Sequence, residues 1–459
     1  MVGERLRSLV GLFLLCLVAW CLCPRERRRR LDWRCVGVGV ALQFALAAAI
    51  LKLPWAEAFF RLCAALVDGL LAYATEGAKM VFGVLVDQPR LAQVFGPENQ
   101  VIFALQQLGP VIIFFAALMA MAYQVGLMQR LVALVARVVV RLMGTSGAET
   151  LSCVGNIFLG MVEAPLMIRP YLPRLTRSEL FCVMVCGLSN VAGTVLAVYV
   201  GLIQDCQAGA AGHLITMSAM SAPAGLVIAK LMLPETEQPE TKGHVVVGEE
   251  RAYANVIDAL TGGASEGLAI AANVVAMLIA MVALVALANG LLGYPGRQHN
   301  QAILAATHTT HAEPTDRAAV QAAADRAGLR ARAWPAPTIQ QLAGYAFRPL
   351  AWCLGVPLED VPKVGELLGV KTVLNEFVAY LQMSQELRAD PAALTPRGRL
   401  LASYALCSFA NFGSVAIMIG GIAALVPGRR RELAELGLLS LVGGTLAACL
   451  TACAVGVLV

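Results

Sequence analysis

Residues 148–168 have the sequence AETLSCVGNIFLGMVEAPLMI, which is long enough to cross a bilayer but unsuited to an ordinary transmembrane helix. Gly155, Gly160 and Pro165 interrupt its interior, and Glu163 places an ionisable group there. Non-helical backbone at membrane depth is tolerated only where it is buried in protein or lines a cavity. The stretch Ala148–Ile168 therefore predicts a re-entrant hairpin.

A second stretch, Leu367–Leu387, has the same character, because Lys371, Asn375 and Glu376 lie in its apolar interior. Each hairpin is followed by a Leu-Thr pair and then by an apolar segment with the pattern C-x-x-x-N, CGLSNVAG in the first copy and CSFANFGS in the second. With the topology given below, the two hairpins enter the membrane from opposite sides. Two such units form an inverted repeat, which is typical of secondary transporters with a binding site at the bilayer midplane.

The composition of the whole chain agrees with a membrane protein. Of its 459 residues, 58% are hydrophobic and only 14% are charged, whereas soluble domains carry roughly 25% charged residues. The net charge of +5 is too small for the basic surface of a nucleic-acid-binding protein. The 13 cysteines are scattered through apolar runs, so we expect small buried side chains and no metal quartet.

Several apolar windows are long enough to cross a bilayer. They are Leu6–Cys23, Cys35–Leu51, Val101–Val125, Leu180–Ile203, Leu214–Leu233, Leu268–Leu292, Leu401–Val426 and Leu436–Val459. The predicted fold is therefore an all-α polytopic membrane protein with about eight transmembrane helices, two re-entrant hairpins in an inverted repeat, and interfacial helices.

The arginines after the first window orient the chain. Residues 24–30 are PRERRRR, with no small-x-small cleavage site before them, so we expect a retained span that ends in the cytoplasm. Alternation then places the amphipathic stretch Leu127–Leu142, the linker 234–251 and residues 429–431 inside, and 293–337 outside. This topology predicts a multi-pass protein of the cytoplasmic (inner) membrane.

Polar groups inside the apolar segments need an explanation, because an ionisable group at the centre of a span costs about 2.5–3.5 kcal/mol. Glu163 and Glu376 either accept hydrogen bonds from a bound polar solute or cap free backbone amides of their own hairpins, and we favour the solute. Asn190 and Asn411 lie mid-span and either face the same solute or join helices. Ser414 is expected on the same helical face as Asn411.

Other functional classes have weaker support. His299, His308 and His311 lie within 293–337, where THTTH has the spacing of metal ligands, but a third convincing ligand is missing and a solvated loop is favoured. An intramembrane enzyme would need a Ser or Cys nucleophile with a His or Lys base in reach. His213, the histidine near a span core, has no recognisable pairing. An enzyme is not expected, while a passive pore or gate protein is an alternative.

Four stretches occur in an order that resembles a known family. Residues 155–166 are GNIFLGMVEAPL, and the later stretches are 213–223 (HLITMSAMSAP), 371–381 (KTVLNEFVAYL) and 409–414 (FANFGS). They are similar to the motifs of the concentrative nucleoside transporters of bacterial type, whose first motif is usually GNxFxGQTEAPL. The resemblance runs from about Leu6 to Val459, with 293–337 largely an insertion.

This resemblance implies a homotrimer that imports nucleosides by coupling to sodium or proton entry. Each subunit would have a scaffold and a moving transport domain built from two inverted hairpin repeats. The implied division is N-terminal scaffold spans 1–126, an interfacial helix 127–147, a first transport repeat 148–206, central spans 207–292 with the cytoplasmic linker, an extracytoplasmic insertion 293–337, a second transport repeat 338–426, and a C-terminal span 427–459.

The resemblance also implies a substrate site. Glu376, Asn411 and Ser414 would hold the ribose hydroxyls, with Phe409 beside the sugar. The tip of the first hairpin would face the nucleobase through Met161, Val162 and Glu163.

A sodium ion is implied as well, and oxygen atoms suit this hard cation. Its ligands would come from Asn156, the Leu159 carbonyl, Asn190 and Val191. Asn190 stands where the family often has Ser, and an amide still offers a carbonyl oxygen. Sodium coupling is therefore expected, with proton coupling through Glu163 or Glu376 as the alternative.

Two further positions depart from the family pattern. The usual Gln is Met161 and the usual Thr is Val162, so two polar groups that would face the base are missing. Purine-preferring relatives also carry Met at this Gln position. We therefore expect a preference for purine nucleosides.

Overall fold

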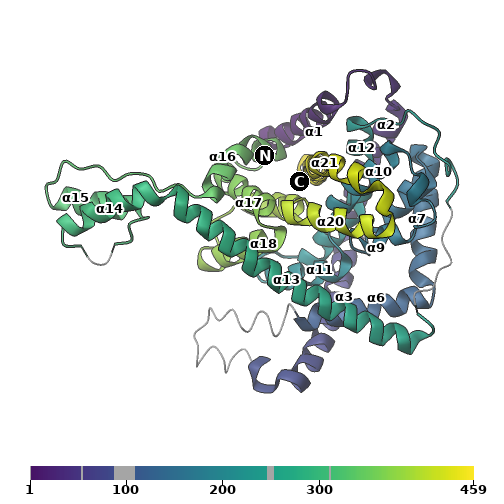
Figure 1. Cartoon of the computed structure of the whole chain (residues 1–459), viewed down its shortest axis with the longest axis horizontal. Coiled ribbons are helices and arrows are strands. Elements are labelled where there is room, and N and C mark those ends of the chain that lie inside the picture. The colour runs from purple at the N-terminus through teal and green to yellow at the C-terminus, as the bar shows by residue number, and fades with distance from the viewer. Residues whose placement is uncertain (1, 53–54, 87–108, 246–252, 310–311) are drawn as a thin grey trace.

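A computed structural model describes residues 2–52, 55–86, 109–245, 253–309 and 312–459 (Figure 1). Within these ranges seven helices are long and apolar enough to cross a membrane, or eight if a bent pair is counted as one span. The predicted all-α polytopic fold with about eight spans is confirmed. The predicted residues 101–108, 246–251 and His311 lie outside the described ranges.

The N-terminal half begins with helices that surround the repeats. They are α1 (Val2–Leu22), α2 (Trp33–Leu51), α3 (Ala56–Phe82), α6 (Gly109–Gln124) and α7 (Leu127–Met143). Helix α3 was not among the predicted spans, because Asp68, Glu76 and Lys79 interrupt its apolar pattern. Helices α6 and α7 meet at 76°, and α7 is the predicted amphipathic helix, with one face buried and arginines on the other.

The first repeat contains the predicted helix–break–helix hairpin. Its elements are α8 (Gly147–Gly155), α9 (Glu163–Leu166), α10 (Arg177–Leu188) and α11 (Gly193–Ile203), followed by α12 (Ala210–Met232). The second repeat has the same order, with α17 (Val361–Val373), α18 (Glu376–Ala389), α19 (Pro396–Leu406) and α20 (Phe412–Leu425), followed by α21 (Arg430–Leu458).

Two predicted spans contain a break, although Arg177–Ile203, which includes the first of them, is still long and apolar enough to cross a membrane. The window Leu180–Ile203 is divided at residues 189–192, and Leu401–Val426 is divided at 407–411. Asn190 and Asn411 therefore lie in the breaks rather than in continuous helix. A hydropathy window cannot detect such breaks, because their residues are small or apolar.

The repeated C-x-x-x-N pattern also differs in register between the two copies. Cys186 lies inside α10, three residues before the C-cap Ser189, whereas Cys407 is itself the C-cap of α19. Asn411 caps α20, but Asn190 lies two residues before the N-cap of α11. The pattern thus located the two breaks without giving equivalent positions.

In both repeats a side-chain hydrogen bond joins the start of the hairpin to the start of the half-helix that follows it. In the first repeat, the N-cap Ser146 of α8 donates to Glu179 of α10 at 2.5 Å. In the second, the N-cap Asp360 of α17 accepts from the hydroxyl of Thr395, the N-cap of α19, at 2.5 Å. Each bond links two helix ends that otherwise leave backbone amides free.

The core includes the helices that follow the repeats, and the long helix α13 (Val256–Leu292) lies outside it. Buried residues make up 89% of the apolar window of α12 and 83% of that of α21, against 11% for α13. Helix α16 (Ile339–Leu354) packs beside α17 and α1. The two termini meet, since Arg5 donates to the carbonyl of Val459 at 2.8 Å.

The insertion 293–337 is not a solvated loop, as the sequence suggested. It forms α14 (Tyr294–Ala306) and α15 (Arg317–Arg326), which lie away from the rest of the chain at the end of α13 (Figure 1). Ile303, Leu304 and Val320 belong to a small hydrophobic core of its own. The sequence did not indicate this core, because alanines contribute much of it and an Ala- and Arg-rich segment is not strongly hydrophobic.

The Asp360 contact yields a stability prediction. Asp360→Ala removes the acceptor for the Thr395 hydroxyl and backbone amide. Hydrogen bonds to a charged group contribute about 1.5–3 kcal/mol, so we expect a clearly lower melting temperature for the detergent-purified protein. Asp390→Ala is the control, because Asp390 is exposed and accepts only within its own turn. Equal melting temperatures for the two variants would contradict this account.

Candidate functional site

The tips of both hairpins and the breaks of both divided spans meet at one cavity of about 1010 Å³. This volume is at the upper end of what small-molecule pockets have. Six of the predicted substrate-binding residues line it, namely Met161, Val162, Glu163, Glu376, Phe409 and Ser414. Sequence positions more than 200 residues apart are thus brought to one site.

Glu376 is held by side chains from outside its own hairpin. Its Oε1 accepts from the Tyr199 hydroxyl at 2.7 Å, and its Oε2 accepts from Asn411 Nδ2 at 2.9 Å. The amides of α18 are capped by Asn375 instead, whose side chain accepts from Val378 N. The Glu376 carboxylate, which is 5% exposed and lines the cavity, is thus held by side chains of other elements.

Asn411 is the predicted residue that positions its neighbours. As the N-cap of α20 it accepts from the backbone N–H of Ser414 at 2.8 Å, while its amide donates to Glu376. Ser414 is the third residue of α20 and lines the cavity. One side chain thus joins the hairpin carboxylate to the half-helix that carries Ser414.

Glu163 differs from Glu376. Its carboxylate lies against its own hairpin tip, near Gly160. The contact is close, because a Cβ at Gly160 would lie 2.1 Å from Glu163 Oε2. Glu163 also lines the cavity.

The two repeats are bonded directly at their breaks. The backbone N–H of Phe409 donates to the carbonyl of Asn190 at 3.0 Å. The Met161 side chain packs over Gly187, where an added Cβ would lie 3.1 Å from Met161 Cβ. Val162 similarly covers Gly421. Small residues in the half-helices therefore let the first hairpin tip approach closely.

The predicted cation ligands lie at the end of α8, at the first hairpin tip and at the first break. Asn156, the C-cap of α8, is 2% exposed, and within the described residues neither its Oδ1 nor its Nδ2 has a partner. Asn190 is 1% exposed and donates to the Asn156 carbonyl at 2.9 Å, but its Oδ1 is unpaired. Buried polar atoms normally have partners. Unpaired amide oxygens suit a hard cation such as sodium.

The other two predicted ligands are Leu159 and Val191. Leu159 lies at the hairpin tip and lines the cavity. Val191 follows Asn190 in the break and is 1% exposed. Both residues are outside helices, so their carbonyls are not used by a helical ladder.

Sequence reasoning missed several polar residues of the cavity. Tyr199 of α11 is fully buried and stacks on Tyr380, with ring centroids 4.8 Å apart. Tyr253 and Glu266 also line the cavity, and the Tyr253 hydroxyl donates to Glu266 at 2.7 Å. Burial together with this bond raises the pKa of Tyr253 to about 12. A tyrosine in the apolar run AVYVGL was the available signal for Tyr199.

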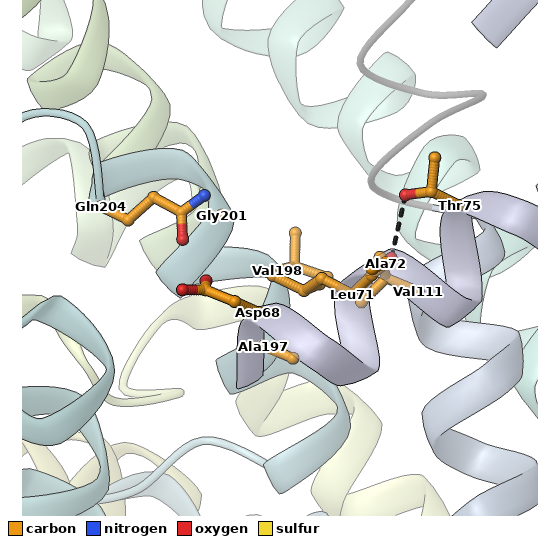
Figure 2. A pocket seen from close by; sticks show the side chains of 9 residues that line it. All are labelled: Asp68, Leu71, Ala72, Thr75, Val111, Ala197, Val198, Gly201 and Gln204. Atoms are coloured by element: carbon orange, nitrogen blue, oxygen red, sulfur yellow. Dashed lines mark hydrogen bonds between the residues drawn. The ribbon is translucent and has the colours of Figure 1, made fainter. Parts of the chain in front are cut away.

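A second cavity of about 360 Å³ lies between α3, α6 and α11. Figure 2 shows Asp68, Thr75 and Gln204 as its polar side chains, and the Thr75 hydroxyl donates to the Leu71 carbonyl at 2.9 Å. None of the predicted site residues lines it. It is therefore separate from the candidate site.

Most of the chain matches models of one protein family. Residues 10–85 match the Na+ dependent nucleoside transporter N-terminus, residues 105–205 match Nucleoside recognition, and residues 213–456 match the Na+ dependent nucleoside transporter C-terminus.

Curated relatives agree. An uncharacterized transporter of Haemophilus influenzae is 36% identical over 456 residues, which cover 99% of this chain and 98% of that protein. The uncharacterized transporter YutK of Bacillus subtilis is 38% identical over 95% of each chain. Sodium/nucleoside cotransporter 1 of Rattus norvegicus is 34% identical over 99% of this chain and 64% of its own length.

The fold agrees as well. CNTnw in an inward-facing substrate-bound state superimposes with a TM-score of 0.82 at 36% identity, over 99% of this chain and 97% of that one. The chain therefore belongs to the sodium-dependent nucleoside transporter family.

Proposed function

We propose that this chain is a symporter that uses sodium entry to import nucleosides by alternating access. As a member of this family it is a nucleoside transporter, not an enzyme, with sodium as its coupling ion, and it is a multi-pass protein of the inner membrane. The observation that supports the mechanism best is the Glu376 network, in which a buried carboxylate lines a cavity shared by both repeats.

The chemistry of this network suits a ribose. A vicinal diol both donates and accepts, a carboxylate accepts, and a serine hydroxyl does both. Each Glu376 oxygen already accepts one bond from the protein, which leaves further lone pairs for the sugar hydroxyls. Ser414 and Phe409 line the same cavity, so in the proposal Ser414 bonds a hydroxyl and Phe409 packs beside the sugar.

Glu376→Gln tests the sugar site. A hydrogen bond to a charged group contributes about 1.5–3 kcal/mol, so transport efficiency for adenosine should fall about 10- to 150-fold. The fall should be much smaller for a dideoxynucleoside that lacks the 2′ and 3′ hydroxyls. Glu366→Gln is the matched control, because Glu366 lies on α17 of the same hairpin and pairs at the surface with Gln382 and Lys363. Wild-type adenosine uptake in Glu376→Gln would exclude this assignment.

The base site is proposed at the first hairpin tip, where Met161, Val162 and Glu163 line the cavity. Two of these three side chains are apolar and can pack on a ring system, and a larger ring buries more surface against them. In the proposal a purine is therefore preferred over a pyrimidine.

Restoring the polar pair should alter this preference. Met161→Gln combined with Val162→Thr adds hydrogen-bonding groups, and each neutral bond contributes about 0.5–1.5 kcal/mol. We expect uridine to compete about 2- to 10-fold better against labelled adenosine in the double variant. Met277→Gln, which changes a cavity residue on α13 outside the hairpin tip, should leave the ranking unchanged. If uridine already competes better than adenosine or inosine in the wild type, the purine preference is wrong.

The sodium ion is proposed to bind Asn156 and Asn190 through their unpaired side-chain oxygens, together with the carbonyls of Leu159 and Val191. Proteoliposomes with an inward sodium gradient and equal pH on both sides should accumulate adenosine above its external concentration. An ionophore that collapses the gradient should abolish accumulation. Accumulation driven by a pH gradient without sodium would support proton coupling instead, and uptake that stops at equal concentrations would indicate a passive pore.

Homotrimeric assembly is part of the same proposal. Helix α13 exposes Leu268, Ile279 and Leu291 along most of its length. Apolar surface of this extent must be covered by lipid or by another copy of the chain. In the proposal α13 belongs to the fixed scaffold, and the two repeats move against it.

A further inference from the structure

Two pairs of helices end at the breaks that surround the cavity. In the first repeat α8 and α10 pack together, and Asn190, just beyond the end of α10, donates to the carbonyl of Asn156 at the end of α8 at 2.9 Å. In the second repeat α17 packs against α19. Each pair therefore brings two helix C-termini close together.

Two adjoining C-termini create an electrostatic requirement. Each helix C-terminus carries about half a negative elementary charge from its unpaired carbonyls, so a pair of them approaches a full negative charge. In a buried site water does not screen this charge, and a single positive ion would balance it. Both repeats share this requirement, because both contain the same pair of ends.

The second repeat meets the requirement with a side chain. Lys371 lies in the last turn of α17, is 0% exposed, and donates from Nζ to the carbonyl of Ala405 in the last turn of α19 at 2.9 Å. A residue in the last turn of one helix thus bonds a carbonyl in the last turn of the other.

The first repeat has no such group. The last turns of α8 and α10, both fully described, contain no basic residue. Cys153 stands three residues before the C-cap of α8, as Lys371 stands three residues before the C-cap of α17. At this break Asn156 and Asn190 instead leave buried side-chain oxygens unpaired.

We infer that Lys371 is a fixed cation that does in the second repeat what the sodium ion does in the first, so that each protomer has one exchangeable cation site. This inference rests on the proposed sodium site at Asn156 and Asn190. Under it, one sodium ion binds per protomer. Removing the ammonium should convert the second break into a site that takes a cation from solution.

Lys371→Gln tests this directly, because it removes the charge and offers an amide oxygen. Radioactive sodium bound at equilibrium to the full-length protein in detergent should rise from about one to about two ions per protomer, without any nucleoside. In the same samples, with choline holding the ionic strength, the slope of the melting temperature against the logarithm of the sodium concentration should about double, since ligands stabilise the state that binds them and two ions would be released on unfolding instead of one.

Lys363→Gln is the matched control. Lys363 lies on the same helix but is partly exposed and pairs with Glu386 at 2.7 Å. It should bind about one sodium ion, like the wild type. A Lys371→Gln protein that is folded and still binds one ion, with unchanged sodium dependence, would overturn the inference.

Lys371→Arg covers the case in which Lys371→Gln does not fold at any sodium concentration. The inference then requires the arginine variant to fold and to bind one sodium ion, because it keeps the charge. Failure of both variants would show that shape rather than charge matters at this position, and would overturn the inference. Absence of sodium binding in the wild type would instead mean that the proposed coupling site is wrong.

Discussion

The structure depends on the need to satisfy backbone groups where helices end inside a membrane. A helix that stops at mid-depth leaves up to four N–H or C=O groups without partners, and lipid offers none. Both repeats contain such ends, at the hairpin tips and at the breaks 189–192 and 407–411. The chain satisfies them with side chains, as Asn375 does for α18 and Asn411 does for α20. The proposed binding groups lie at or beside these caps, because polar side chains are required there in any case.

The same requirement joins the two repeats. The Phe409 amide bonds the Asn190 carbonyl, and Tyr199 of the first repeat donates to Glu376 of the second. Each repeat thus supplies partners that the other lacks. A change at the first break can reach the carboxylate in the second hairpin through two hydrogen bonds and the residues between them. This connection gives the proposed coupling of ion and nucleoside a physical route.

The sequence predicted the hairpins because they carry visible conflicts. Glycine, proline and glutamate inside an apolar run cannot be explained by a spanning helix, and Glu163 and Glu376 followed from that conflict. The breaks at Asn190 and Asn411 were less visible, since loss of helical hydrogen bonds leaves no trace in hydropathy. Tyr199 was missed because a tyrosine in an apolar run is most often a packing residue. Tyr199 bonds Glu376, which lies far away in the sequence on the second hairpin. No local sequence pattern contains such a contact.

The two repeats have the same order of helices but differ in the side chains at their paired helix C-termini. Where the second repeat carries Lys371 at the meeting of two helix ends, the first has Cys153 and, beside it, unpaired amides. A lysine side chain is always present in the protein, whereas a sodium ion is bound only when the sodium concentration is high enough. Order in the first hairpin would then depend on sodium, while order around Glu376 would not. An inverted repeat with identical halves would have no such asymmetry, and a sodium gradient could not act on one hairpin separately from the other. Under the proposal, the lysine in the second repeat thus leaves ion sensing to the first repeat and sugar recognition to the second.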